Sequence, residues 1–165
     1  VSNNLDFMAE YYFGPLGLFS AGFFYKNIDN WLYEFTDNNY TYNGETGYDY
    51  SQVRNGRNAE VTGFEVALQT SLMDNVTLYS NYTYTDSKTD GIEGRSDAPL
   101  VGAVKNMFNG SLAYESDKLF IRASLNYADA SADELGSESW EDRYYDDQVF
   151  VDLNASYSLL SLIHI

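Results

Sequence analysis

The chain has no cysteine, 2 prolines and 1 histidine in 165 residues. Without cysteine it forms no disulfide bridge and offers no thiolate ligand to a metal. The histidine, His164, lies near the end of the chain, outside any pattern that would supply a Ser-His-Asp triad or a histidine metal site. We therefore predict a protein that is not an enzyme, with no catalytic residue, no metal site and no cofactor.

Basic residues are also scarce, with 9 Lys and Arg against 25 Asp and Glu, for a net charge of -16. Such a chain repels phosphate backbones, so nucleic-acid binding is excluded. The longest apolar stretch, around Leu16 to Tyr25, is broken by Gly and Ser and is shorter than the roughly 20 residues of a spanning helix. A membrane β-barrel stays possible, because its strands need only about ten alternating residues.

Aromatic residues are abundant, and the chain alternates between apolar and polar positions. In the stretch Val61 to Asp86, the apolar positions recur at every second residue on both sides of a turn at Asp74-Asn75. Strict alternation predicts β-strands, so this stretch reads as a hairpin with one apolar and one polar face. Polar-face residues are Glu65, Gln69, Asn81 and Thr83.

The same period predicts five further strands, at residues 5–13, 18–25, 105–114, 119–127 and 149–157. The pattern of the second is compatible with an extension through Trp31, Tyr33 and Phe35. The predicted fold class is therefore all-β, an antiparallel up-and-down meander of about seven strands. The chain starts inside an alternating segment, and we expect it to be a fragment.

Short and long connections alternate along the chain. The short ones fall at residues 14–17, 74–75 and 115–118, and the long polar ones, which we interpret as loops, at 36–57, 87–98 and 128–147. In a meander all long connections share one end of the sheet, an asymmetry typical of transmembrane β-barrels. The alternative is a soluble or surface all-β binding module whose apolar face forms an ordinary core.

Several motifs, in order and spacing, resemble the C-terminal half of the barrel of TonB-dependent outer-membrane receptors. They are Asn4-Leu5-Asp6 with Glu10-Tyr11-Tyr12-Phe13, Ser20 to Asn30, Asn58 to Glu65, Asn81-Tyr82-Thr83-Tyr84-Thr85-Asp86, and Val151 to Tyr157. The resemblance implies a barrel of about 22 strands with a plugged lumen, in a Gram-negative outer membrane. It would import a scarce ligand, of the siderophore-iron, cobalamin or glycan class, with energy passed on by TonB.

The resemblance also implies partners: outer-membrane lipid and lipopolysaccharide, a plug domain and the TonB system, which we expect outside these residues, and a small-molecule or glycan ligand. We assign residues 1–158 to the barrel and expect 159–165 to be an artefactual tail, the alternative being an apolar continuation of the last strand. A non-energised porin or adhesin barrel would share the strands but lack the plug.

Aromatic residues in the long connections are the candidate ligand contacts, because they could stack on an aromatic siderophore or a sugar ring. They are Tyr40, Tyr42, Trp140, Tyr144 and Tyr145. The competing interpretation is a girdle of aromatics at extended strand ends. The acidic residues of 128–147 could in principle bind a divalent cation, but we expect a solvated acidic rim, which favours a neutral or cationic ligand.

Overall fold

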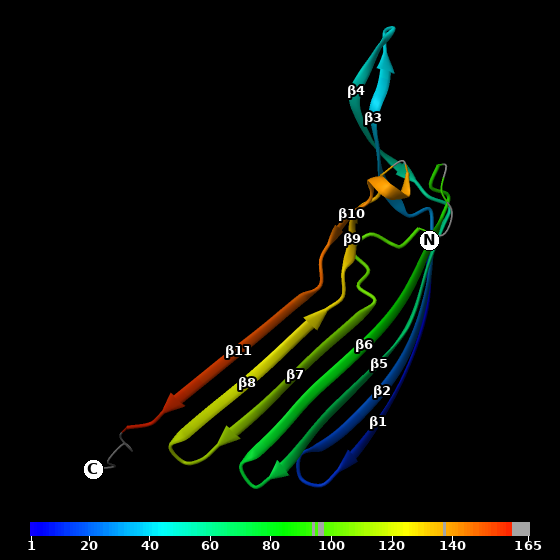
Figure 1. Ribbon diagram of the computed structural model, residues 1–165. Helices are drawn as coiled ribbons and strands as arrows, with labels where there is room; N and C mark the ends of the chain where they lie inside the picture. Colours follow the sequence, from blue (N-terminus) through cyan, green and yellow to red (C-terminus); the bar gives the residue numbers. More distant parts are fainter. Residues whose placement is uncertain (94, 96–97, 137, 160–165) are drawn as a thin grey trace, which may run out of the picture.

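A computed structural model describes residues 1–93, 95, 98–136 and 138–159. Its main element is a sheet of seven antiparallel strands that follow one another in chain order (Figure 1). The strands are β1 (Ser2–Phe13), β2 (Gly17–Asp29), β5 (Asn58–Met73), β6 (Val76–Asp90), β7 (Asn106–Glu115), β8 (Leu119–Ala128) and β11 (Gln148–Tyr157). The predicted seven-strand meander is confirmed.

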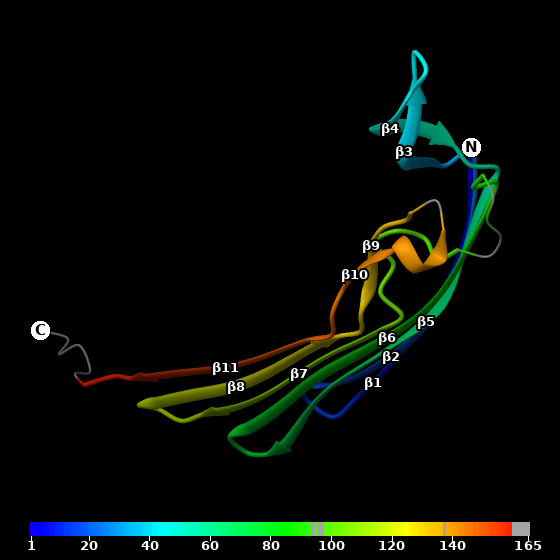
Figure 2. The ribbon, with the colours of Figure 1, turned by 45° about the horizontal axis from the view of Figure 1, so that its top comes forward.

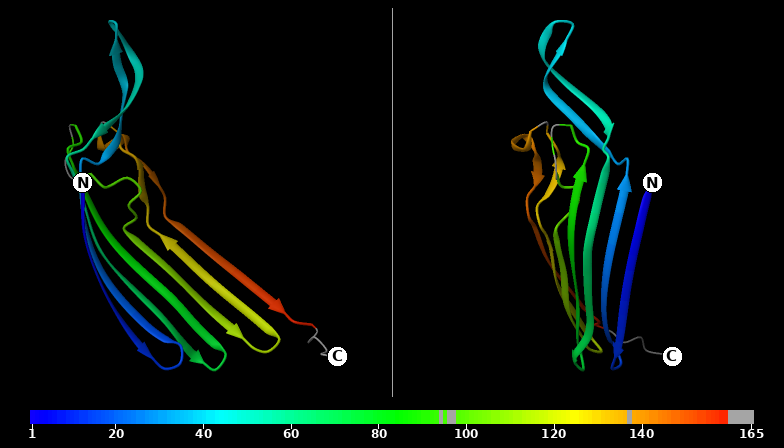
Figure 3. Two further views of the ribbon diagram at one scale, coloured as in Figure 1. Left: turned by 180° about the vertical axis from the view of Figure 1, so that it is seen from behind. Right: turned by 90° about the vertical axis from the view of Figure 1, so that its right-hand side faces the viewer.

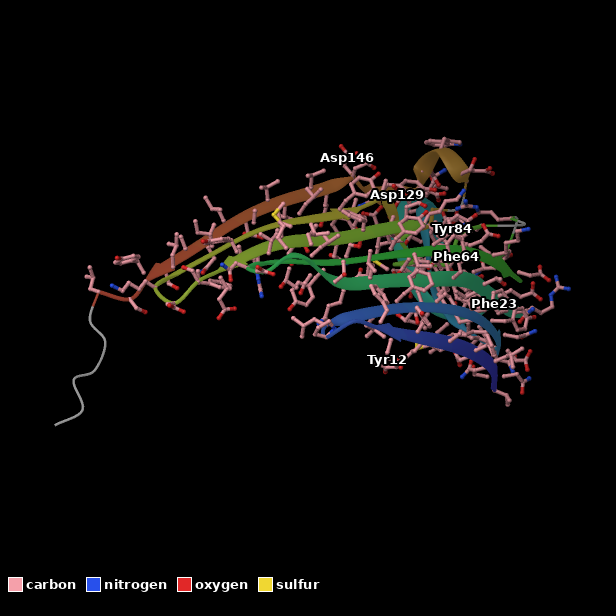
Figure 4. All side chains as sticks on the ribbon, turned by 90° about the horizontal axis from the view of Figure 1, so that it is seen from below. Tyr12, Phe23, Phe64, Tyr84, Asp129 and Asp146 are labelled. Carbon is pink, nitrogen blue, oxygen red and sulfur yellow. The ribbon has the colours of Figure 1, made fainter. Side chains whose placement is uncertain are left out.

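The register keeps every apolar face on the same side of the sheet. One line of paired residues runs Ala9, Ala21, Val66, Tyr82, Phe108, Tyr127 and Val149. A neighbouring line includes Phe23, Phe64 and Tyr84, whose rings follow one another across the strands (Figure 4). Phe64 and Tyr84 stack with their ring centroids 5.5 Å apart. The alternation read from the sequence thus produces two continuous faces.

The sheet is a single curved layer (Figure 2). Large apolar side chains on its outer strands are open, with Val151 74% and Leu153 76% exposed. Among the described residues, no second layer packs on the apolar face, so a soluble module with its core on this face does not match the fold. No described helix is both long and apolar enough to span a membrane.

The short turns lie at one end of the sheet and the long connections at the other (Figures 1 and 3). We name the second of these the long-loop end; it holds the described residues of the stretches 30–57, 91–105 and 129–147. The asymmetry predicted from connection lengths is therefore confirmed.

The prediction of a long loop over residues 36–57 is wrong. This stretch belongs to a hairpin of β3 (Leu32–Tyr42) and β4 (Glu45–Asn55), which projects away from the main sheet (Figure 1). Asn43 and Gly44 turn the chain with φ angles of 51° and 88°. Left-handed values at both central residues define the tight hairpin turn for which Asn-Gly is the strongest sequence signal. The stretch contains many other Asp, Asn and Gly residues, so the Asn43-Gly44 pair does not stand out in the sequence.

Other strand boundaries also differ from the prediction. β2 ends at Asp29 instead of extending through Phe35, because Asn30 takes a left-handed φ of 56° and redirects the chain. β5 and β6 are 16 and 15 residues long, so β6 occupies the first part of the expected loop 87–98. Both strands exceed the length of about ten residues that crosses a bilayer.

The stretch 128–147 is likewise more ordered than the predicted loop. It contains β9 (Ser131–Glu134), a short 3-10 helix η1 (Ser139–Glu141) and β10 (Arg143–Tyr145). β9 and β10 pair as a small antiparallel sheet beyond the ends of β8 and β11 (Figure 2). Serine, acidic and glycine residues hid these elements, because each strand is too short to show a period.

The buried core lies at the long-loop end, where all three long connections meet the start of β5. We call it the loop core; its members are Trp31, Tyr33, Ala59, Ile92, Ala98, Ala132 and Leu135. Gly56 leaves room for the Trp31 indole, since a side chain at Gly56 would overlap that ring. The Gly56 N–H also donates to the Trp31 carbonyl at 2.7 Å. The three connections therefore pack as one unit.

A buried ion pair closes this unit. Arg95 donates to both carboxylate oxygens of Asp142, at 2.5 and 2.8 Å, and their side chains are 10% and 2% exposed. Burial opposes ionisation of Asp142, but the hydrogen bonds from Arg95 and the Gly136 N–H outweigh it and hold its pKa below the ordinary value. The same pairing raises the pKa of Arg95. Asp142 therefore contradicts the prediction of a fully solvated acidic rim.

Replacing Arg95 by Ala in the intact protein should loosen residues 131–145, because Asp142 is left charged and buried. Removing one partner of a buried pair costs about 3–5 kcal/mol. Hydrogen exchange at the Gly136 and Gly102 amides, which donate to Asp142 and Ala132, measures the opening. Arg57→Ala is the control, because the Arg57–Asp90 pair is exposed and such pairs contribute about 0–1 kcal/mol. Equal exchange in both variants would contradict the assignment.

The pH dependence of this packing has a definite sign. Because folding lowers the pKa of Asp142, its contribution is complete above the ordinary aspartate pKa of about 3.9. It is lost as the pH falls through the lowered folded value. Amide protection in residues 131–145 should therefore stay constant from neutral to mildly acidic pH and fall only in strong acid. If amide protection already declines at pH ~6, well above the pKa of an aspartate stabilised in this way, another group controls the packing.

Candidate functional site

Two of the candidate aromatic residues lie on the projecting hairpin. Tyr40 stacks on Tyr50 with ring centroids 4.4 Å apart, and Tyr42 meets Tyr48 edge-on at 6.2 Å. Tyr42 is 65% exposed. The four rings thus form an open aromatic ladder on β3 and β4, fixed by cross-strand pairing and available to a ring-shaped ligand.

The other three candidates lie on η1 and β10, beside the loop core. Trp140 on η1 is 80% exposed, and Tyr144 and Tyr145 on β10 are 55% and 57% exposed. Arg143 anchors β10 to β9 through ion pairs with Asp133 and Glu134 at 3.2 and 2.8 Å. The Arg95–Asp142 pair fixes the turn between η1 and β10. The exposed aromatic side chains of η1 and β10 are therefore attached to a backbone that ion pairs hold in place.

The structure brings both groups to the long-loop end but keeps them on separate supports. Within the described residues, ring contacts join tyrosines inside the hairpin, and none connects Tyr40 or Tyr42 with Trp140, Tyr144 or Tyr145. A link exists below the rings, where the Thr36 hydroxyl donates to Glu134 at 3.2 Å. The long-loop end therefore carries two separate aromatic surfaces, one on the hairpin of β3 and β4 and one on η1 and β10.

The polar face of the sheet carries a hollow of about 320 Å³. Its polar lining comes from β5 to β8 and consists of Gln69, Tyr79, Ser80, Asn81, Asn109, Ser111, Ser124 and Asn126. Asn109 donates to Asn81 at 2.8 Å, which ties amides of neighbouring strands together. A second hollow contains Glu65, Asn81 and Thr83. The polar residues predicted to share a face do so, and they form a surface suited to water.

Asp129, at the outer end of β8, is held by its neighbours. Its carboxylate accepts from the Tyr127 hydroxyl at 2.5 Å and from the Asn106 amide, and these hydrogen bonds lower its pKa. Across the described residues, no group of three or more His, Asp or Glu side chains is placed to hold a metal ion. The carboxylates of 128–147 that pair with Arg95, Arg143, Tyr127 and Asn106 act as structural acceptors.

Sequence reasoning missed the residues that position this end of the molecule. The sequence pattern is compatible with a strand that extends through Trp31 and Tyr33, whereas in the structure both residues belong to the loop core. Arg54 stacks over Phe35, 3.7 Å from the ring centroid, and pairs with Glu93. The Asn43-Gly44 turn could have revealed the hairpin, but no sequence signal connects Arg95 with Asp142, 47 residues further along.

Comparisons with known proteins agree with this geometry. The family model for the TonB dependent receptor-like β-barrel matches residues 1–162. The iron-regulated outer membrane virulence protein of Vibrio cholerae is 34% identical over 104 residues, which is 61% of this chain. The chain spans 16% of the length of that relative.

Solved structures show the same fold. The siderophore receptor PiuA from Acinetobacter baumannii aligns with 96% of this chain at a TM-score of 0.69 and 16% identity, over 22% of its own length. A mutant of the ferric enterobactin receptor PfeA from Pseudomonas aeruginosa aligns with 96% at 0.68 and 16% identity, over 24% of its length. With a family match over nearly the whole sequence, the chain belongs to the TonB-dependent receptor β-barrel family and forms part of an outer-membrane barrel.

Proposed function

We propose that this chain is part of an outer-membrane active-transport receptor that binds a scarce ligand and imports it with energy from the TonB system. The family match over residues 1–162 is the observation that carries the proposal. Among the ligand classes considered, siderophore-iron is favoured over cobalamin and glycans, because relatives are described as siderophore, ferric enterobactin and iron-regulated proteins.

Each surface of the segment has a role in this proposal. The apolar face contacts outer-membrane lipid, and its aromatic outer end lies at the level of the lipopolysaccharide. The polar face, with its amide and hydroxyl hollow, lines the lumen and meets a plug domain. We assign these roles to residues 1–158; the proposed tail, 159–165, lies outside the described residues from position 160 onward.

The ligand contacts are proposed at the long-loop end. Trp140, Tyr144 and Tyr145 are open to solvent, and the Arg95–Asp142 and Arg143 pairs hold their backbone in place. A fixed ring loses little conformational entropy when a ligand stacks on it. Tyr40 and Tyr42 offer a second, more distant contact on the projecting hairpin. Stacking suits the aromatic groups of many iron chelators as well as sugar rings.

Import requires an energised membrane if the proposal holds. Cells that depend on this receptor for iron should take up a labelled ferric siderophore. The Trp140→Ala, Tyr144→Ala and Tyr145→Ala variants should each bind the siderophore about two- to tenfold more weakly, because each loses one aromatic contact. Tyr157→Ala is the matched control, because Tyr157 is 58% exposed at the opposite end of the sheet. Unchanged affinity in all three variants removes these residues from the site, and uptake without TonB removes energy coupling.

The lipid-facing role is tested by adjacent residues of β8. Leu125 lies on the apolar face and Asn126 on the polar face. Leu125→Arg should destabilise the folded barrel by about 2–4 kcal/mol, the cost of a cation facing the bilayer interior. Asn126→Arg keeps its charge in a hydrated lumen and should cost far less. The temperature at which the receptor loses its folded mobility in detergent gels provides the measurement, and equal shifts would rule out lipid contact.

A further inference from the structure

We propose that a cavity beside the base of β3 binds a small ring compound that carries a positive charge, such as a protonated arylalkyl amine. The cavity has a volume of about 310 Å³ and lies between the first residues of β3, the pair Leu100 and Val101, and the end of β9. It is separate from the exposed aromatic surfaces, because Trp140, Tyr144 and Tyr145 do not line it.

The floor of the cavity is apolar. Trp31 and Tyr33 are each 7% exposed and Leu135 is 3% exposed. The Trp31 indole N–H donates to the Asp90 carbonyl at 3.3 Å, and the Tyr33 hydroxyl accepts from the Glu93 N–H at 3.3 Å. Because Trp31 and Tyr33 are almost fully covered, the apolar surface open to a ligand comes mainly from Leu32, Leu100 and Val101. A ligand ring that replaces water there is stabilised by apolar contact.

Carboxylates supply the charge of the cavity. Glu34, Asp133 and Glu134 line it, and the described lining includes no Lys or Arg. Glu34 accepts from the Ser51 hydroxyl at 2.5 Å. This pairing holds the side chain without cancelling its charge.

Arg143 does not neutralise this set. It pairs with Asp133 and Glu134, but it lines a neighbouring hollow with Thr36 and Asn38 instead of this cavity. One arginine therefore balances one of the three carboxylates, and the cavity keeps a formal charge of -2. A cation is attracted to such a site and an anion is repelled.

The dimensions restrict the ligand further. A volume of about 310 Å³ is at the lower limit of ligand pockets, which span roughly 300–1,000 Å³. Tryptamine fits this description, because its indole ring suits the apolar floor and its ammonium group suits the carboxylates.

Calorimetric titration of the purified full-length receptor in detergent tests the proposal. Tryptamine, N-acetyltryptamine and indole-3-propionate carry the same ring with a positive, a neutral and a negative group. We expect tryptamine to bind about tenfold or more tightly than the neutral compound, since a hydrogen bond to a charged group contributes about 1.5–3 kcal/mol. The anion should not bind. Equal affinities, or no binding of tryptamine, would overturn the proposal.

Variants locate the binding in this cavity. Glu34→Gln should weaken tryptamine about tenfold, by loss of one charged partner, and leave N-acetyltryptamine unchanged. Val101→Trp, at the 41% exposed Val101, should block both compounds by filling the cavity. Glu45→Gln is the control, because Glu45 lies at the tip of the hairpin beside the turn. If Glu34→Gln binds tryptamine like the wild type, the charge assignment fails.

The cavity could instead be filled by another segment of the receptor, and the solvent accessibility of residue 101 distinguishes the two cases. Val101→Cys in the native receptor should react rapidly with a maleimide, and tryptamine should slow the reaction. Protection of Cys introduced at this position without tryptamine would show that the receptor itself covers the cavity, and would overturn the proposal. These measurements require no import, so their failure leaves the transport function untouched.

Discussion

Backbone pairing across the seven-strand sheet is the constraint on which the rest of the structure depends. Antiparallel pairing without a crossover satisfies the N–H and C=O groups of each inner strand on both sides. In a lipid environment this pairing is obligatory, because no water is present to replace it. The sheet therefore needs no second layer for its hydrogen bonds, and both of its faces remain free for different surroundings.

The register, regular except between Ser71 and Met73 beside the β5–β6 turn, gives those two faces their character. A slip of one residue in any strand would send its apolar residues to the polar side. Because the register continues from β1 to β11, Phe23 and Phe64 stay with the apolar face, while Asn81 and Asn109 meet on the other. One face suits lipid and the opposite face suits water, as expected for the wall of a receptor barrel.

The long-loop end solves a different problem. Beyond the membrane, long connections need packing of their own, and the loop core with the Arg95–Asp142 pair supplies it. The exposed aromatics and the acidic cavity both rest on this unit, but their chemistry differs. Trp140 is an open stacking surface, whereas Trp31 is a buried wall beside Glu34, Asp133 and Glu134. The proposed transported ligand and the proposed small cation would therefore meet separate sites.

The sequence by itself determined the seven strands of the main sheet, their two faces and the end at which the long connections lie, because these follow from local alternation and from connection length. Only the tertiary structure decided how the long connections fold. Tyr40 and Tyr42 belong to a hairpin, and Arg95 and Asp142 meet although they are distant in the chain. Such contacts depend on how separate segments converge in space, and no local period records them. For the same reason the cavity between β3 and β9 was not apparent in the sequence.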